Sequence, residues 1–212
     1  SQASVPADAS FIPLAARFVE TRHSPDAPAS KRDWFFTRSE MWIETAGKDD
    51  TEIWERDERR EISLKRIFHG DRKLIEYTSG ELRAQRRIKA WSVLATILDE
   101  RILARLEKRG ETTVLKQPAV KYVGRLGDER VEVVWLARQA IPAKLVRKNG
   151  ETSYTLELQE LRETPDASWP TVKREIDAYE WLDGADLGDR EYDPFVRKVL
   201  SLDAGRPAGH TH

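Results

Sequence analysis

Acidic residues gather near the end of the chain, where their carboxylates could converge on a metal ion. Asp183, Asp186 and Asp189 share one short segment with Glu191 and Asp193. Carboxylate oxygens are the ligands that a hard cation such as Ca²⁺ prefers. The spacing differs from that of an EF-hand loop, whose ligands fall at alternate positions. The segment is therefore either a cation site or a solvated acidic loop that caps a helix.

Two histidines, His210 and His212, lie at the end of the chain. Their imidazoles could bind copper or zinc, with His23 or His69 as a further ligand. The alternative is a terminus that binds metal weakly, or a remnant of cloning. The candidate metal ligands are thus Asp183, Asp186, Asp189, His210 and His212.

Motifs for catalysis are absent. The chain has no cysteine, which excludes disulfides, thiolate metal ligands and a thiol nucleophile. It also lacks a nucleophile elbow, a Gly-rich phosphate loop and a His-Glu-x-x-His motif. Glu40 and Glu44 could do acid–base work, but such a pair is common on an exposed strand face. We expect no enzyme activity, no catalytic residue and no cofactor.

Tryptophan is abundant, with seven residues in the chain. Its large ring fills a core or lines an apolar pocket, and the two roles are compatible because a pocket in a sheet is an unfilled part of the core. The residues that we expect to contact an apolar ligand are Trp34, Trp42, Trp54, Trp91, Leu94, Leu98 and Trp135.

Charge balance and hydropathy exclude two classes of partner. The 36 basic and 37 acidic residues nearly cancel, so the sequence predicts no nucleic-acid binding. No apolar run approaches the roughly 18 residues that span a bilayer.

The elements that must position these residues are mainly strands. The segment from Thr113 to Leu161 predicts a meander with one covered face and one wet face, including a strand over 114–123 and a turn at Asn149-Gly150. Residues 11–22 predict a short helix or a first strand, and 23–31 a loop. Further strands are expected over 34–44, 51–57, 60–68, 73–78 and 81–88, with an edge strand over 171–179.

One helix is expected from about Lys89 to Lys108, because its apolar residues recur at helical spacing and Gly110 follows as a C-cap. A second, of two turns, is expected after the Asp193-Pro194 cap. The strands predict one large antiparallel sheet, a sandwich or a barrel. A helix between two runs of strands most simply lies across the concave face of their sheet.

Two stretches carry a resemblance to a known family. Residues 131–158, VEVVWLARQAIPAKLVRKNGETSYTLEL, resemble the closing strands of the LolA/LolB-like lipoprotein-carrier superfamily, and residues 67–77, IFHGDRKLIEY, resemble its hairpin of adjacent strands. The resemblance covers about residues 11–165. It implies an α+β fold, a large curved antiparallel sheet forming an unclosed half-barrel, with a helix covering a concave apolar face that receives acyl chains.

These observations predict a domain plan and a role. We expect a flexible N-terminus over 1–10, a half-barrel over 11–165, an extension packed on the same domain over 166–203 and a mobile tail over 204–212. The start Ser1–Ala7 resembles an exported protein whose signal has been removed, although a trimmed recombinant chain would look the same. A periplasmic location is therefore expected.

The expected function is a non-enzymatic carrier for a lipid, a lipoprotein acyl chain or another apolar ligand. Its partners would be that ligand or a lipidated protein, with an envelope protein as a possible further partner. The alternative is a metal-linked or protein-interaction module that works through the acidic C-terminal segment.

Overall fold

The computed structural model describes residues 10–47, 49–170 and 175–204, and its strands form one sheet. The strands are β1 (Leu14–Ser24), β2 (Ala27–Arg38), β3 (Trp42–Ala46), β4 (Asp50–Arg56), β5 (Ile62–Phe68), β6 (Lys73–Tyr77), β7 (Glu107–Val114), β8 (Gln117–Leu126), β9 (Glu129–Leu136), β10 (Ile141–Asn149), β11 (Thr152–Arg162) and β12 (Glu180–Asp183). The helices are α1 (Ser79–Ala84), α2 (Trp91–Thr96) and α3 (Pro194–Ala204), with 3-10 turns η1 (Glu100–Arg105), η3 (Ile176–Ala178) and η4 (Gly184–Arg190).

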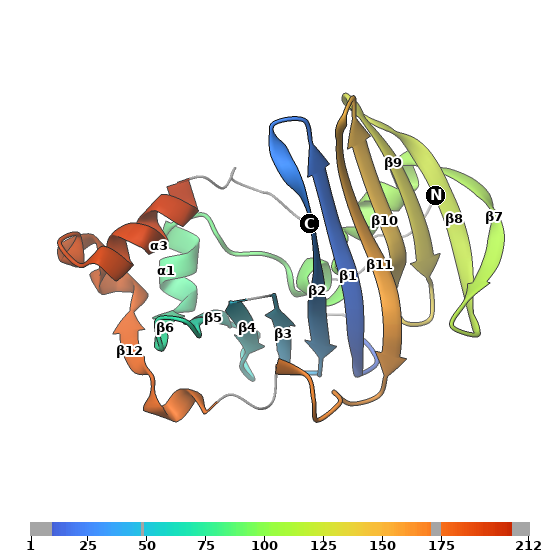
Figure 1. Cartoon of the computed structure of the whole chain (residues 1–212). Helices are drawn as coiled ribbons and strands as arrows, with labels where there is room; N and C mark the ends of the chain where they lie inside the picture. The colour runs from blue at the N-terminus through green and yellow to red at the C-terminus, as the bar shows by residue number, and fades with distance from the viewer. Residues whose placement is uncertain (1–9, 48, 171–174, 205–212) are drawn as a thin grey trace.

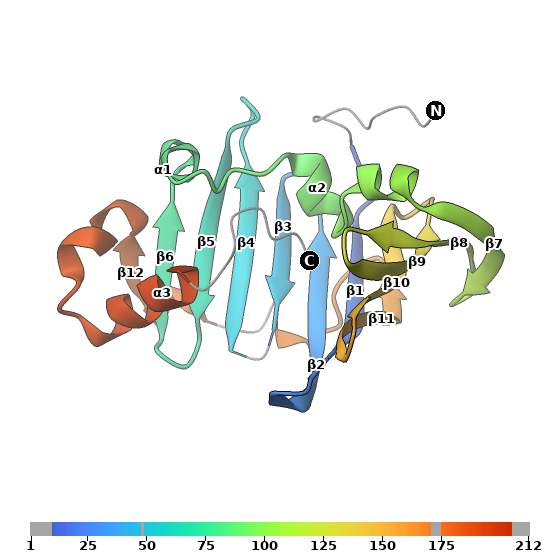
Figure 2. The same cartoon turned by 90° about the horizontal axis from the view of Figure 1, so that it is seen from above.

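The strands follow the order β12-β6-β5-β4-β3-β2-β1-β11-β10-β9-β8-β7 across the sheet. Neighbours are antiparallel, except that β12 pairs in parallel with β6. Adjacent strands twist relative to one another, which makes a sheet of this width curl. Figures 1 and 2 show the result, in which β12 and β7 end up at opposite ends of the molecule and do not meet. The predicted fold class, an unclosed antiparallel half-barrel with helical cover, is confirmed.

The core occupies the concave face. Phe195 and Val196 of α3 and Leu82 of α1 belong to the same buried cluster as Trp91 of α2 and Val133 of β9. Figure 2 shows α1 and α3 beside β5 and β6, and α2 farther along, beside β2. One continuous apolar layer therefore joins the helices to the whole length of the sheet.

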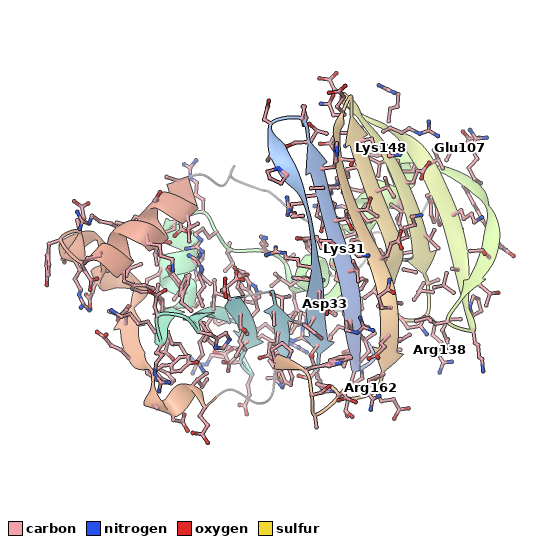
Figure 3. All side chains as sticks on the ribbon, in the orientation of Figure 1. Lys31, Asp33, Glu107, Arg138, Lys148 and Arg162 are labelled. Atoms are coloured by element: carbon pink, nitrogen blue, oxygen red, sulfur yellow. The ribbon has the colours of Figure 1, made fainter. Side chains whose placement is uncertain are left out.

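The opposite, convex face is partly wet and partly covered. Over β1, β2, β10 and β11 it carries charges of both signs, including Lys31 and Asp33, which Figure 3 labels on β2. Arg17 bridges Asp33 and Glu160 there, at 3.6 and 3.5 Å. This is the wet face that the alternation of the meander predicts.

The segment after β11 covers another part of the convex face. The ring of Trp169 packs on that of Phe35, with centroids 5.3 Å apart. Farther along, Tyr179 packs against Ile67 of β5 and Leu74 of β6. The chain then turns round the edge of the sheet as β12 and returns to the concave side as α3.

Helix α3 begins as the sequence predicts. The Asp193 carboxylate accepts a 2.9 Å hydrogen bond from the backbone N–H of Phe195, and Pro194 is the first helical residue. The helix is longer than the predicted two turns, with 11 residues. Asp203 in its last turn pairs with the buried Arg66 of β5 at 2.8 Å, which fastens the C-terminal helix to the sheet.

The predicted long helix over 89–108 is wrong. It is divided into α2 and the 3-10 turn η1, and Lys108 already belongs to β7. Ile97 interrupts it with φ 65° and ψ −48°, and the backbone N–H of Leu98 donates a 2.6 Å hydrogen bond to the Thr96 carbonyl. This is a γ-turn of positive φ, a strained conformation that is rare for a β-branched residue. Gly110 lies at a bulge in β7, with φ 134°, and caps no helix.

Other local predictions also need correction. The expected strand over 81–88 is wrong, because residues 81–84 belong to helix α1, whose N-terminus is capped by the Thr78 hydroxyl, and 85–88 are irregular. Residues 23–31 form a tight hairpin between β1 and β2 instead of a loop. Of the two alternatives for 11–22, a short helix or a first strand, the structure has the strand. The single strands expected over 34–44 and 114–123 are each divided by a turn. The edge strand expected over 171–179 starts at Glu180, and 171–174 lie outside the described residues.

The ends of the predicted domain plan cannot be compared with the structure, because residues 1–9 and 205–212 lie outside the described part. None of the helices in the described ranges is long and apolar enough to cross a membrane.

Candidate functional site

Six of the seven residues predicted to contact an apolar ligand lie on the concave face. Four are part of the buried cluster and two pack against it partly exposed; these are Trp54, Trp91, Leu98 and Trp135 in the first group and Trp34 and Leu94 in the second. Trp42 is the exception. It precedes Ile43, which lies opposite Trp54, so the alternation along β3 turns Trp42 to the convex face. Trp42 therefore drops out of the candidate site.

The cluster around these residues is well filled. Leu98 has 0% of its surface exposed, and Trp91 and Trp135 only 3% and 4%. The ring of Trp34 packs at a tilt against Phe18 and stacks on Phe36, at centroid distances of 5.6 and 6.1 Å. These side chains act as core in the structure as it stands. A ligand could reach them only if the cover formed by α2 and η1 moved.

The cover contains the strained γ-turn at its midpoint. Besides the turn's own hydrogen bond, the Thr96 hydroxyl lies 2.7 Å from the Ser92 carbonyl and 2.8 Å from the Leu98 carbonyl, which secures the break. Two short elements joined by a strained residue form fewer internal bonds than one long helix. The cover is thus a segment whose position depends on its contacts with the sheet.

Arg38 supplies the main polar contact between the cover and the sheet. It lies at the end of β2 and is only 2% exposed. Its Nη1 donates to the Ala95 carbonyl of α2 at 2.7 Å, its Nη2 to the Gln139 carbonyl at 2.6 Å and its Nε to the Ile12 carbonyl at 3.0 Å. The guanidinium also lies 5.2 Å from the centroid of the Phe11 ring.

The environment of Arg38 is unusual because its hydrogen-bond partners are backbone carbonyls. Burial lowers the pKa of the guanidinium to about 10, which still leaves it charged at neutral pH. A buried charge without a counter-ion costs free energy that carbonyl dipoles offset only in part. One side chain thus ties three segments, far apart in the sequence, to the end of β2. Sequence reasoning missed this residue.

A second polar group is buried on the convex face. Glu44 is 6% exposed, opposite Thr37 of β2. Burial raises the pKa of its carboxyl to about 7. Glu40 is exposed in the turn between β2 and β3, so the two carboxylates do not share the exposed strand face that the sequence suggested.

The predicted metal ligands have different surroundings in the structure. Asp183 caps η4 by accepting a 3.0 Å hydrogen bond from the Ala185 N–H. Across the described residues, no three His, Cys, Asp or Glu side chains come together in a group that could hold a metal ion, and Asp186 and Asp189 are thus not gathered into one. His210 and His212 lie outside the described residues. His69 is engaged by Thr51 and Tyr179, at 2.9 and 3.1 Å.

No family model and no curated protein matches this sequence. The fold is similar to that of several solved structures. One is PNGF-II, with 12% identity, 91% of this chain and 33% of that chain covered, and a TM-score of 0.42. Another is MucB in the MucA/MucB complex of Pseudomonas aeruginosa, with 16% identity, coverage of 76% and 55%, and a TM-score of 0.40. A third is a LolA superfamily protein from Nitrosomonas europaea, with 6% identity, coverage of 76% and 91%, and a TM-score of 0.29.

These matches concern the backbone alone. The chain spans about a third of the length of PNGF-II and just over half of that of the MucB chain. At this degree of likeness the matches assign no function.

Proposed function

We propose that this chain is a periplasmic, non-enzymatic carrier that binds the acyl chain of a lipid or lipoprotein, or another apolar ligand, between its concave face and the cover formed by α2 and η1. The observation that carries the proposal is the attachment of that cover. It lies over an aromatic and aliphatic surface and is interrupted by a strained turn. Two buried arginines hold it: Arg38 hydrogen-bonds the Ala95 carbonyl, and Arg56 stacks on the Trp91 ring at 4.6 Å.

The energetics of such binding are reasonable. Each methylene of an acyl chain that leaves water gains about 0.8 kcal/mol. Lifting the cover would break its hydrogen bond from Arg38 and expose Leu98 and Trp91. The free energy of ligand binding must exceed the free energy of this opening. Apolar groups of the ligand would take the place of the side chains that the cover withdraws. Binding by displacement thus suits a ligand with a long, flexible chain better than a small rigid one.

The direct test is binding of a fluorescent fatty acid to delipidated protein, supported by native mass spectrometry of the protein as purified. We expect one bound acyl chain per molecule. Leu94→Gln should weaken binding at least tenfold, because this half-buried residue lies on the cover and packs against the cluster. Leu202→Gln on the exposed side of α3 is the matched control and should leave binding unchanged. Wild-type protein that binds no acyl chain at tens of micromolar would refute the proposal.

A further inference from the structure

A pocket of about 400 Å³ lies beside the cover site, where the tip of the β1–β2 hairpin meets the tip of the β10–β11 hairpin. Figure 1 shows the two tips next to each other at the top of the molecule, and β1 pairs directly with β11. The volume is in the range of sites that hold small molecules. None of the residues predicted to bind an apolar ligand lines it.

The pocket wall contains a row of three polar side chains on the concave face. Tyr154 lies opposite Arg22 of β1 on one side and opposite Arg147 of β10 on the other. The Arg22 guanidinium stacks over the Tyr154 ring, 4.9 Å from its centroid. The next row towards the cover contains Leu156 and Leu145, both fully buried. The concave face of β10 and β11 therefore changes from polar to apolar within one row, whereas the same row continues over β1 and β2 with the charged Glu20 and Arg32.

Glu20, which lies opposite Leu156 in the adjacent row, holds Tyr154 and Arg22 in place. Its carboxylate accepts hydrogen bonds from Tyr154 at 2.9 Å, from Arg32 at 2.8 Å and from Arg22 at 3.4 Å. Burial alone would raise the pKa of Glu20, but the bond from Tyr154 and the charge of Arg32 outweigh it and hold this pKa below its usual range. Glu20 is thus a buried anion that orients Tyr154 and Arg22, and it is a positioning residue.

Two charges in the pocket have no partner of their own. Arg147 and Glu129 both line it and are half-buried. Neither side chain forms an ion pair or a hydrogen bond with any other residue that the structure describes. Arg147 lies opposite Val131, and Glu129 is two residues before Val131 on the same face of β9. A cation and an anion are thus presented side by side on one wall, without being paired to each other.

We propose that this pocket binds a zwitterionic phosphate ester, with the phosphate held by Arg147 and Arg22 and a primary amine held by Glu129. Guanidinium groups match phosphate oxygens in geometry and charge. A ligand with phosphate alone would leave Glu129 unpaired and would be repelled by it. Phosphoethanolamine has both groups, either as a free ester or as the head of a phospholipid.

The position of the pocket bears on the carrier proposal. A phospholipid whose head occupied the row of Arg147 would direct its chains towards Leu145 and Leu156, and from there under the cover. This last step rests on the proposed function, whereas binding of the head group does not. The two can therefore fail separately.

Calorimetry with O-phosphoethanolamine, inorganic phosphate and ethanolamine tests the pocket. We expect phosphoethanolamine to bind with one site per chain, and more tightly than phosphate or ethanolamine. Arg147→Gln should weaken this binding at least tenfold. Glu129→Gln should weaken phosphoethanolamine at least fivefold without weakening phosphate, because only the amine contact is lost.

The matched controls are Lys148→Gln and Arg130→Gln. These residues lie opposite each other, next to Arg147 and Glu129 along the strands, but on the other face of the sheet. Neither variant should change the affinity for phosphoethanolamine by more than about twofold, the size of effect that a distant rim charge has after screening by salt. Urea midpoints close to wild type would show that all four variants fold.

Three outcomes would overturn the inference: no phosphoethanolamine binding by wild-type protein, equal losses in the control variants, or a Glu129→Gln variant that binds phosphoethanolamine as well as wild type does. A dihexanoyl phosphatidylethanolamine arm identifies the source of the head group. If this lipid binds more tightly than the free ester and the gain disappears in Leu94→Gln, the source is a phospholipid. If the two bind equally, the pocket recognises a soluble ester and the carrier proposal loses its support here.

Discussion

The side chain of Arg38 donates a 2.7 Å hydrogen bond to the carbonyl of Ala95, joining the end of β2 to the last turn of α2. The same guanidinium bonds two further carbonyls, at Ile12 and Gln139. A hydrophobic residue of similar volume would fill the space without the cost of burying a charge. The position of the cover therefore depends on a polar contact, and the hydrogen bonds of this one guanidinium can be released together.

Replacement of Arg38 with methionine should loosen the cover. It leaves three carbonyls without their donor, of which those of Ala95 and Gln139 are buried and that of Ile12 is part-buried, so we expect a loss of about 2–4 kcal/mol in the free energy of unfolding. Hydrogen exchange should accelerate most in residues 91–105. Arg125→Met, an exposed arginine on the convex face of β8, is the control. Equal exchange of residues 91–105 in Arg38→Met and wild type would show that the arginine does not hold the cover.

Substitution of two leucines in and beside the cover should distinguish a side chain packed in the core from one that is available to a ligand. Leu98→Ala removes a side chain that is fully buried, so we expect a loss of about 2–5 kcal/mol. Leu94→Ala removes a side chain that is only half-buried and should cost about 1 kcal/mol. Urea unfolding measures both. If Leu98→Ala costs no more than Leu94→Ala, Leu98 is not packed in the core.

Glu44 should make stability fall as pH rises through neutrality. Its folded pKa, about 7, lies above the ordinary value of 4.5, so the folded state binds the proton more tightly. Stability is then greatest below about pH 4.5 and decreases until the carboxyl is ionised above pH 7. The full effect is at most about 3 kcal/mol.

The comparison of wild type with Glu44→Gln isolates this effect from other carboxyl groups. The difference between the two unfolding free energies should change between pH 5 and pH 8, with the glutamine variant gaining relative stability at the higher pH. A difference that stays constant over this range would mean that Glu44 is not buried in the folded protein.

Two glycines in η4 should respond differently to alanine. A methyl group on Gly184 would lie 2.5 Å from a ring carbon of Tyr77, whereas one on Gly188 would meet nothing within 4 Å. Gly184→Ala should therefore cost about 1–3 kcal/mol, since the buried ring has little room to move. Gly188→Ala should change stability by less than about 0.5 kcal/mol. Thermal or urea unfolding of the pair tests how closely η4 packs on β6.

The sequence predicts much of the sheet because alternation and turn chemistry are local. Gly150 adopts a φ of 60° in the hairpin after Asn149, and Ile53 and Trp54 face opposite sides of β4, as their adjacency requires. The prediction of one long helix was wrong because its interruption is not visible in the local apolar pattern. The apolar period runs through Ile97 without interruption. In the structure the Thr96 hydroxyl bonds carbonyls on both sides of the break, and Asp99 caps η1. Leu98 and Leu103, which follow the break, are part of the buried core.

The candidate site was harder to predict. Arg38 precedes a polar turn and resembles a solvated strand end, because its partners are backbone carbonyls at Ile12, Ala95 and Gln139. Every residue has a backbone carbonyl, whatever its side chain, so no sequence motif reveals these partners. Trp42 was expected to face the ligand because the expected strand ran unbroken from Trp34 to Glu44. The turn between β2 and β3 changes which residues face the core.

The parallel pairing of β12 with β6 has a consequence for biogenesis. Lys73–Tyr77 reach the folding compartment well before Glu180–Asp183, so the outer edge of β6 stays open until the C-terminal segment arrives. An open edge is a template for pairing with other chains, and nascent β proteins are vulnerable there. A chaperone that shields this edge until the last segment emerges would therefore raise the yield of folded protein.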